Sequence, residues 1–225
     1  MASVHGNLPD VSNTAMALQR GAQALGLTLY DKQLEALLAY LDLLVKWNRA
    51  YNLTAIRDPG DMVIRHLLDS LAIHTYLEPE YHRLIDVGTG GGLPGVPLAI
   101  LNPQRTFSLL DSNGKKTRFL FQVKTALGLD NMAVHQARIE SFQPDEPYDA
   151  VLSRAFASLA DMIAGCRHLL QPAGHFLAMK GQYPEAELVA MGDGVRLLQS
   201  HKLAVPGLTE ERHLLDIQLL DATSN

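Results

Sequence analysis

A glycine-rich stretch constrains the fold of this 225-residue chain more than any other feature. The segment from Leu84 to Ile100 reads LIDVGTGGGLPGVPLAI, with five glycines among the eight positions from Gly88 to Gly95. An apolar run precedes these glycines and a helix-like run follows them. The arrangement predicts a turn between a strand and a helix, in which backbone N–H groups approach a ligand beside a helix N-terminus. The glycines alone do not decide which ligand that is.

Short apolar runs alternate with longer helical patterns after this stretch. Such alternation predicts a parallel sheet covered by helices on both faces. Two final apolar segments, 195–206 and 211–220, are close enough to pair as an antiparallel hairpin at the sheet edge. We therefore expect an α/β fold with a seven-stranded, mostly parallel sheet. The other expected strands are 83–88, 106–112, 132–138, 148–155 and 174–181, and the expected helices are 94–102, 115–129 and 158–170.

The chain before Leu84 is predicted to be helical. Apolar residues from Leu34 to Val45 follow helical spacing, with Asp31 as the expected N-cap. A second helix is indicated by Asp58 at the N-cap, Pro59 at the first helical position and Asp61 in a capping-box position. We expect a helical N-terminal region, residues 1–80, packed on a ligand-binding body, residues 81–225.

Composition sets limits on the function. The 47% hydrophobic content is enough for one large domain, and a domain of this size needs no partner to fold, so we expect a monomer. A net charge of −5 restricts any nucleic-acid surface to a local patch. The single cysteine, Cys166, fits a reducing cytoplasm, and no run of about 18 apolar residues predicts a membrane span. We expect a cytoplasmic protein without a membrane partner.

Two glycine spacings overlap in the turn. Gly90, Gly92 and Gly95 match the G-x-G-x-x-G pattern of dinucleotide sites. Gly88, Gly90 and Gly92 match the shorter G-x-G-x-G pattern of S-adenosylmethionine sites. Either match alone is a weak signal.

Nearby acids favour S-adenosylmethionine over a dinucleotide. Asp111, at the end of the next expected strand, can accept hydrogen bonds from ribose hydroxyls in both classes of site. Asp86, at the root of the turn, would crowd a pyrophosphate but favours a ligand that carries an ammonium and a sulfonium. The chain is also too short to add the substrate domain of an ordinary dehydrogenase. Ile139 and Glu140, after the third expected strand, are placed to bind an adenine ring.

Several segments occur together in a fixed order from about Lys46 to Leu215: KWNRAYNLTAIRDPGDMVIRHLLDSL, LIDVGTGGGLPGVPLAI, LLDSNGKKTRFL, VLSRAFASLADM, MKGQ and ERHLL. In order and spacing they resemble the motifs of the bacterial RsmG (GidB) family of ribosomal RNA guanine-N7 methyltransferases. The chain departs from the family at Gly91, where proline is usual. We expect Gly91→Pro to leave activity intact and Gly88→Val to block cofactor binding.

The resemblance implies a class I, Rossmann-like methyltransferase fold and S-adenosyl-L-methionine as cofactor, with S-adenosyl-L-homocysteine as product. It implies methylation of N7 of guanosine 527 in 16S ribosomal RNA, presented as naked RNA, as the 30S subunit or as its assembly intermediate. It also places Gly88 and Leu93 on the methionine side of the cofactor and Arg154 within the site. The expected cofactor-binding residues are Gly88, Gly90, Gly92, Leu93, Asp111, Ile139, Glu140 and Arg154.

Methyl transfer to guanine N7 needs no proton removed first, because this nitrogen carries a free lone pair. Positioning should therefore suffice, and we expect no nucleophile, catalytic triad or metal. His66 and Asp69, three residues apart in RHLLDS, are candidates to face the cofactor together. They could equally form a pair on a helix surface.

Cations near the expected cofactor mouth are candidates for RNA contacts. Lys46, Arg49 and Arg57 extend the patch into the helical region, and Tyr51 and Phe156 are candidate stacking partners for the target base. The predicted RNA-binding residues are Lys115, Lys116, Arg118, Arg65, Lys180 and Arg212.

Two other functions stay open on this reasoning. A small-molecule S-adenosylmethionine-dependent methyltransferase would be expected to close an apolar pocket over its substrate. A nucleotide-binding module or NAD-linked oxidoreductase would bind NAD and not S-adenosylhomocysteine.

Overall fold

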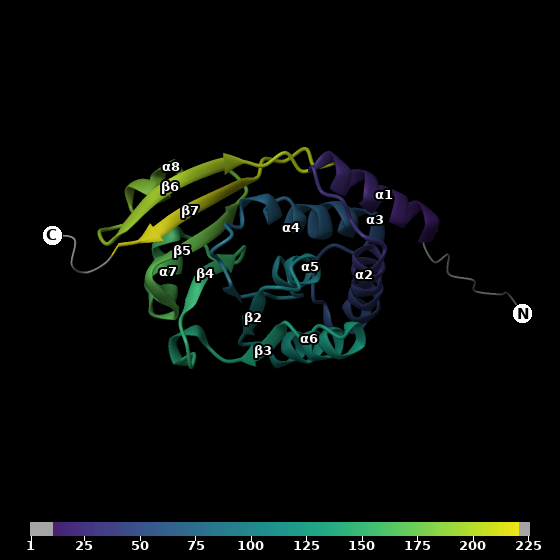
Figure 1. The fold of residues 1–225 in the computed structure, drawn as a ribbon, viewed down its shortest axis with the longest axis horizontal. Helices are drawn as coiled ribbons and strands as arrows, with labels where there is room; N and C mark the ends of the chain where they lie inside the picture. Colours follow the sequence, from purple (N-terminus) through teal and green to yellow (C-terminus); the bar gives the residue numbers. More distant parts are fainter. Residues whose placement is uncertain (1–10, 221–225) are drawn as a thin grey trace, which may run out of the picture.

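A seven-stranded sheet organises residues 11–220, the part of the chain that the computed structural model describes (Figure 1). The strand order is β3-β2-β1-β4-β5-β7-β6. Strands β1 to β5 are parallel, whereas β7 is antiparallel to both of its neighbours, β5 and β6. The expected sheet and edge hairpin are confirmed. The strands are β1 (Arg83–Val87), β2 (Thr106–Asp111), β3 (Met132–Gln136), β4 (Tyr148–Ser153), β5 (Leu170–Lys180), β6 (Val195–Lys202) and β7 (His213–Leu219).

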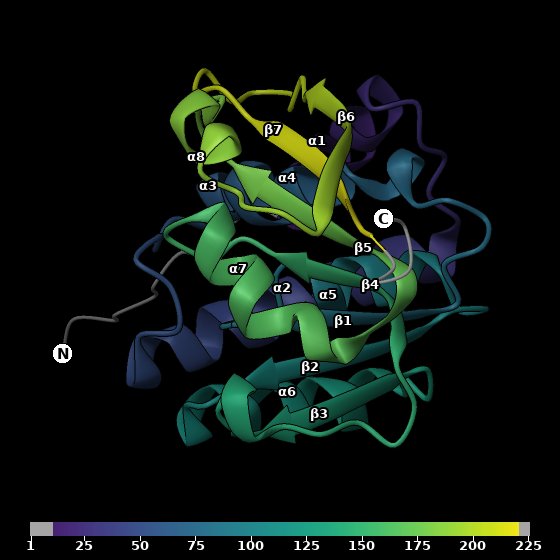
Figure 2. The same ribbon diagram turned by 90° about the vertical axis from the view of Figure 1, so that its left-hand side faces the viewer.

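Helices cover both faces of the sheet (Figure 2). One face packs against α1, α2, α5, α6 and the helical segments between residues 59 and 76, and the other packs against α7. The helices are α1 (Val11–Ala24), α2 (Asp31–Tyr51), α3 (Pro59–Met62), the π-helix η1 (Val63–Leu68), α4 (Asp69–Leu71), η2 (His74–Tyr76), α5 (Gly95–Leu101), α6 (Gly114–Leu127), η3 (Ile139–Ser141), α7 (Leu159–Cys166), η4 (Arg167–Leu169) and α8 (Glu185–Val189).

Successive strand residues alternate between the two faces. Leu84 of β1 belongs to the core under α2 and α5, while its neighbour Ile85 belongs to the core under α7. Leu177 and Phe176 of β5 divide in the same way. Burial on both faces explains why these strands are continuous apolar runs in the sequence. The chain order reverses between β1 and β4, so a crevice forms at the carboxyl ends of these strands.

Of the two predicted helix N-caps, one is confirmed and the other is wrong. The Asp58 carboxylate accepts a hydrogen bond from the backbone N–H of Asp61 at 2.9 Å, as expected of an N-cap. The prediction for α2 was wrong by one residue, because Tyr30 is the N-cap and its N–H donates to Gln33 Oε1 at 3.0 Å. Asp31 is instead in the first turn, where its charge stabilises the helix dipole.

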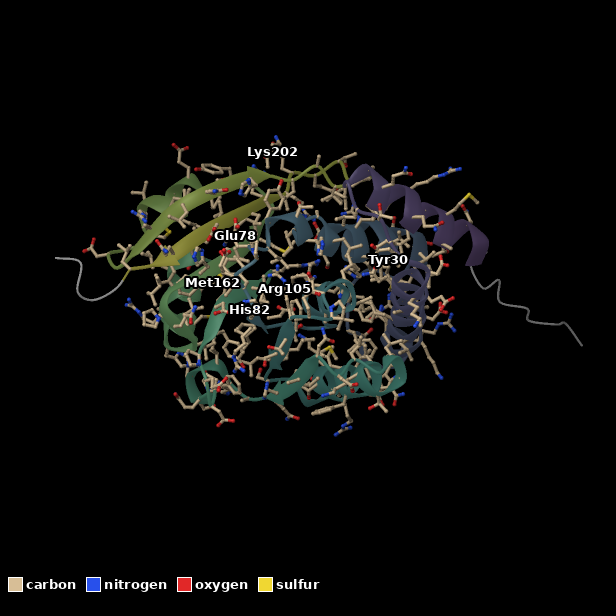
Figure 3. The ribbon with its side chains drawn as sticks, in the orientation of Figure 1. Tyr30, Glu78, His82, Arg105, Met162 and Lys202 are labelled. Carbon is tan, nitrogen blue, oxygen red and sulfur yellow. The ribbon has the colours of Figure 1, made fainter. Side chains whose placement is uncertain are left out.

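The helical N-terminal region and the sheet share one core. Leu18 of α1 and Leu37 of α2 lie in the same buried cluster as Leu109 of β2. Arg105, which is labelled with Glu78 in Figure 3, fixes the connection into β1. Its guanidinium donates to the carbonyl oxygens of Glu78 at 2.8 Å and Tyr81 at 2.7 Å. No helix within residues 11–220 is long and apolar enough to cross a membrane.

Candidate functional site

The glycine turn joins β1 to α5. Gly88, Gly90 and Gly92 have φ angles of 67°, 61° and 95°, which glycine adopts at the lowest cost. A Cβ atom on Gly88 would lie 2.9 Å from the Cβ of Ala155, so there is no room for a side chain there. Gly88 is exposed and Gly90 is half-buried. The backbone of these two residues therefore reaches the surface, but their N–H groups donate within the protein, to the Leu110 carbonyl and to Asp111 Oδ2, and not toward a ligand as expected.

The second half of the turn packs inward. Gly92 is buried, and a Cβ atom there would lie 2.5 Å from Val96 Cγ2. Leu93 is only 8% exposed and belongs to the core shared with the helical region. Of the predicted loop contacts, Gly88 and Gly90 reach the surface, whereas Gly92 and Leu93 fix the turn against α5.

Asp86 has a role that differs from the one expected. Its side chain is buried, and its Oδ2 accepts hydrogen bonds from Thr89 Oγ1 at 2.7 Å and from the Gly95 N–H at 2.8 Å. The carboxylate thus joins the two ends of the turn. Burial raises the pKa of Asp86 to about 6, although the bonds from Thr89 and Gly95 lower it. The sequence interpretation of Asp86 as a charge facing the ligand is corrected accordingly.

Tyr40 of α2 holds the turn from the other side and was missed by the sequence interpretation. Its hydroxyl donates to the Gly91 carbonyl at 2.6 Å, and the ring is fully buried. Burial raises the pKa of Tyr40 above its ordinary value, so the hydroxyl remains a donor. The available signal was a hydroxyl within the apolar stripe formed by Leu37, Leu41 and Leu44.

A cavity of about 350 Å³ opens beside the turn, at the carboxyl ends of β1, β2 and β4. The structure brings four predicted residues from three separate segments to its lining: Gly88, Asp111, Ile139 and Glu140. Phe156, predicted as a stacking partner for RNA, also lines this cavity. Apolar walls, two carboxylates and a backbone without a side chain at Gly88 suit a ribonucleoside moiety such as that of S-adenosylmethionine.

Asp111 lies at the cavity, as predicted, and also supports the turn. Its Oδ2 accepts a hydrogen bond from the Gly90 N–H at 2.9 Å, and its Oδ1 accepts one from the Asn113 N–H at 2.8 Å. Lys116 Nζ lies 3.5 Å from Asp111 Oδ2. This predicted RNA contact is therefore placed over the cofactor side of the turn.

Three charged residues meet between the sheet and the π-helix. Asp69 is 2% exposed; its Oδ1 accepts a hydrogen bond from Arg212 Nε at 3.0 Å, and its Oδ2 lies 3.0 Å from Arg154 Nη1. Arg154 follows β4 and Arg212 precedes β7, and each guanidinium side chain is about one quarter exposed. One buried carboxylate thus fixes two cations that keep partial access to solvent.

His66 does not pair with Asp69. Its Nδ1 donates to the Arg65 carbonyl at 3.0 Å, so in the neutral ring Nε2 accepts from Thr54 Oγ1 at 2.8 Å. Burial and the nearby Arg154 charge lower the pKa of His66 to about 4. The two candidates, predicted to act together, have separate partners. They lie on the π-helix η1 and directly after it, and π-helical turns are frequent at functional sites.

The remaining residues predicted to contact RNA differ in how exposed their side chains are and in whether they are already paired. Lys115 and Arg118 are exposed on α6, and Arg65 forms a half-exposed ion pair with Glu210 at 2.7 Å. Lys180 is instead held inside the protein, because its ammonium donates to Glu187 Oε2 at 2.8 Å and its side chain is 12% exposed. Its position links β5 to α8 and does not favour a direct contact with RNA.

Comparisons with known proteins cover most of the chain. The family model described as "rRNA small subunit methyltransferase G" (GidB) matches residues 33–215. The chain is 54% identical to the ribosomal RNA small subunit methyltransferase G of Cellvibrio japonicus over 204 residues, 89% of this chain and 93% of the relative. It is 55% identical to that of Pseudomonas aeruginosa (strain LESB58), over 88% of this chain and 92% of the relative.

Solved structures share the fold. A SAM-dependent methyltransferase from Aquifex aeolicus aligns with a TM-score of 0.57 at 14% identity, covering 75% of this chain and 97% of that one. The S-adenosylmethionine-dependent methyltransferase SibL aligns with a TM-score of 0.58 at 14% identity, covering 93% and 75%. These similarities confirm the expected Rossmann-like methyltransferase fold.

Proposed function

Because the chain belongs to the rRNA small subunit methyltransferase G (GidB) family, we propose that it methylates N7 of guanosine 527 in 16S ribosomal RNA. Methylation of small-subunit ribosomal RNA from S-adenosylmethionine follows from the family, and the base and its position are the finer part of the proposal. We propose that the protein acts in the cytoplasm as a monomer, on the RNA, the 30S subunit or an assembly intermediate.

The observation that carries this proposal is the nucleoside-sized cavity directly beside the glycine turn. Gly88 allows the backbone to approach the cofactor, Ile139 and Phe156 contact the adenine ring, and Asp111 accepts from the ribose hydroxyls. S-adenosylmethionine supplies an electrophilic methyl group when bound there. Arg154, next to the turn, completes the cofactor side of the site.

The chain's contribution to the reaction is alignment of the base. The N7 lone pair forms the new N–C bond while the C–S bond breaks toward sulfur, so guanine becomes cationic and S-adenosylhomocysteine leaves. No proton moves before this step, and no general base is needed. His66 fits this requirement, because both ring nitrogens are engaged and its low pKa keeps it neutral.

Asp69 acts as a positioning residue in this account. It anchors Arg154 on the cofactor side and Arg212 on the RNA side through one buried carboxylate. Arg212 Nη1 also donates to the Glu211 carbonyl at 2.8 Å, and the other guanidinium N–H groups of the two arginines can bind phosphate oxygens of the RNA. Fixed cationic donors position a substrate that offers no reactive proton.

Labelled cofactor tests the substrate class. The protein is incubated with methyl-labelled S-adenosylmethionine and with unmethylated 16S ribosomal RNA, 30S subunits from cells that lack the enzyme, or a metabolite extract. The proposal expects label in the RNA or in the subunits. Label only in small molecules would support the small-molecule methyltransferase instead, and tight binding of NAD would support the oxidoreductase.

A further inference from the structure

Two adjacent segments of this acidic protein carry cations and no carboxylates. They are residues 43–57, between Asp42 and Asp58, and residues 112–129, between Asp111 and Asp130. Together they contain seven of the chain's 19 lysines and arginines and none of its 24 aspartates and glutamates. The cations are Lys46, Arg49, Arg57, Lys115, Lys116, Arg118 and Lys124.

The two segments form one face because α2 packs on α6. The Trp47 ring of α2 lies 5.7 Å from the Phe119 ring of α6, measured between centroids. The cations of both helices thus add to a local positive potential on a protein whose net charge is −5. Contact with a phosphate backbone requires such a patch, and not a positive net charge.

An aromatic groove of about 400 Å³ lies on this face, between α2 and α6. Trp47 and Tyr51 form its wall, with ring centroids 5.1 Å apart and ring planes inclined at 31°. Tyr51 is 40% exposed although it is a large aromatic residue. The lining residues are Leu43, Lys46, Trp47, Ala50, Tyr51 and Gln122.

The groove connects to the cofactor cavity along α6. This helix begins at Gly114, three residues after Asp111, which lines the cavity. Lys115, Arg118 and Gln122 follow at spacings of three and four, so they share one side of the helix. Lys115 lies about 10 Å from Gln122 along the helix axis. A cationic path therefore leads from the cofactor mouth to the aromatic groove.

We propose that this groove binds an unpaired base of the RNA substrate, outside the target guanine, by stacking on Trp47 and Tyr51. Lys46 contacts the adjoining phosphate, and the Gln122 amide reaches the edge of the base. Sites for single-stranded RNA combine stacking aromatics with a cationic groove in this way. The inference rests on the proposed function, since it places a second part of the same RNA.

Paired substitutions at the two ends of α2 test the groove. Tyr51→Ala and Lys46→Ala change the groove. Tyr30→Ala and Lys32→Ala change the same residue types farther along the helix, about 30 Å away for the tyrosines and about 20 Å away for the lysines. Tyr30 is 72% exposed and Lys32 is also exposed, so neither control disturbs the core. The measurements are the affinity for an unmethylated 16S rRNA transcript and, by calorimetry, the affinity for S-adenosylhomocysteine.

The groove variants should bind the transcript more weakly, on the order of tenfold for Tyr51→Ala. Their affinity for S-adenosylhomocysteine should equal that of the wild type, and the control variants should bind both ligands normally. Equal RNA binding by groove and control variants would overturn the inference while leaving the proposed function standing. A wild-type protein that binds the cofactor product but neither the transcript nor 30S subunits would overturn both.

Tryptophan fluorescence gives a second readout. Trp47 is the chain's single tryptophan, so its emission reports on the groove directly. Titration with a single-stranded decamer of uridine should quench this emission, and Tyr51→Ala should shift the midpoint to a higher RNA concentration. Unchanged emission at saturating decamer would contradict stacking. In another outcome, groove variants bind naked RNA normally and lose binding only to assembled 30S subunits. That result would show that a protein occupies the groove, and it would also overturn the inference.

Discussion

Buried polar side chains determine the conformation of the glycine turn. The Asp86 carboxylate joins Thr89 to Gly95, and Asp111 and Tyr40 bond to the backbone at Gly90 and Gly91. Each of these side chains comes from a different element: β1, β2 and α2 respectively. The turn therefore depends on the whole fold for its shape, and single residues within it have predictable effects.

Gly88→Val should abolish measurable cofactor binding. The added Cβ atom would lie 2.9 Å from Ala155 Cβ, and a β-branched residue is strained at a φ of 67°. Isothermal titration with S-adenosylhomocysteine should show affinity reduced by at least about 100-fold, because strain and steric clash together exceed about 3 kcal/mol. A Gly88→Val protein that binds normally would contradict this account of the turn.

Gly91→Pro is the matched change within the same turn. Gly91 has no positive φ, and a Cβ atom there would lie 3.3 Å from the flexible end of Leu44. We expect methyl transfer activity within about twofold of the wild type, because neither a positive φ nor a rigid neighbour opposes a side chain at this position. A loss of activity as large as that of Gly88→Val would show that the turn tolerates no change at all.

His66 should make stability depend on pH. Its folded pKa of about 4 lies below the ordinary histidine value of 6.5, so the unfolded chain binds the proton more readily as the pH falls. Stability is then lost between about pH 6.5 and pH 4. Asp86 has the opposite effect on stability. Because its folded pKa is raised to about 6, its contribution to the free energy of unfolding is lost as the pH rises.

A comparison with His66→Gln isolates the histidine from Asp86. Between pH 7.5 and pH 5 the wild type should lose about 2 kcal/mol more unfolding free energy than the variant does. Urea denaturation at the two pH values measures the difference. Parallel losses in both proteins would mean that His66 titrates in the folded state near its ordinary pKa.

At the scale of elements, α2 supports the cofactor loop through one hydrogen bond. Tyr40→Phe removes the donor to the Gly91 carbonyl and should cost about 1–3 kcal/mol of unfolding free energy, with cofactor affinity reduced severalfold. Tyr81→Phe is the control, because the Tyr81 hydroxyl is buried without a hydrogen-bond partner among residues 11–220. The denaturation midpoint should fall for Tyr40→Phe and stay at the wild-type value for Tyr81→Phe. A midpoint that falls for Tyr81→Phe and not for Tyr40→Phe would show that Tyr40 does not support the turn.

The sequence predicted elements better than the contacts between them. Strands and the turn were predictable because short apolar runs and glycine spacing are local patterns, and Asp58 was found as a cap by the same logic. The partners of Asp86 and Lys180 were not predictable, because nothing local shows that Asp86 bonds to Thr89 and Gly95 or that Lys180 pairs with Glu187. The direction in which a side chain points is set by tertiary packing.

In the candidate site too, positions at strand ends were predictable and contacts between side chains were not. The pocket residues Asp111, Ile139 and Glu140 were predictable because parallel strands end at one edge of a sheet. The separation of His66 from Asp69 was not, because a π-helix changes the angle between residues three apart and Arg154 and Arg212 arrive from distant strands. Long-range ion pairs leave no signature in local spacing.

At the scale of the whole molecule, the helical region and the sheet should fold as one unit. Both contribute to a single buried cluster, and Arg105 closes the connection between them. A fragment of residues 81–225 would expose the face of the sheet and of α5 and α6 that α2 and η1 cover. It should show no cooperative thermal transition by circular dichroism. A fragment that melts cooperatively and binds S-adenosylhomocysteine would mean that the body is an independent domain.

In the proposed function, the cavity and the cations near it direct one methyl group to one base. Mass spectrometry of 16S ribosomal RNA, from cells lacking the gene and from the same cells complemented with it, tests this most directly. The account predicts 7-methylguanosine at position 527 only in the complemented cells, and an unmodified guanosine there when the complementing protein is Gly88→Val. A guanosine 527 that stays unmodified in complemented cells, or a methyl group that appears at another base, would contradict it.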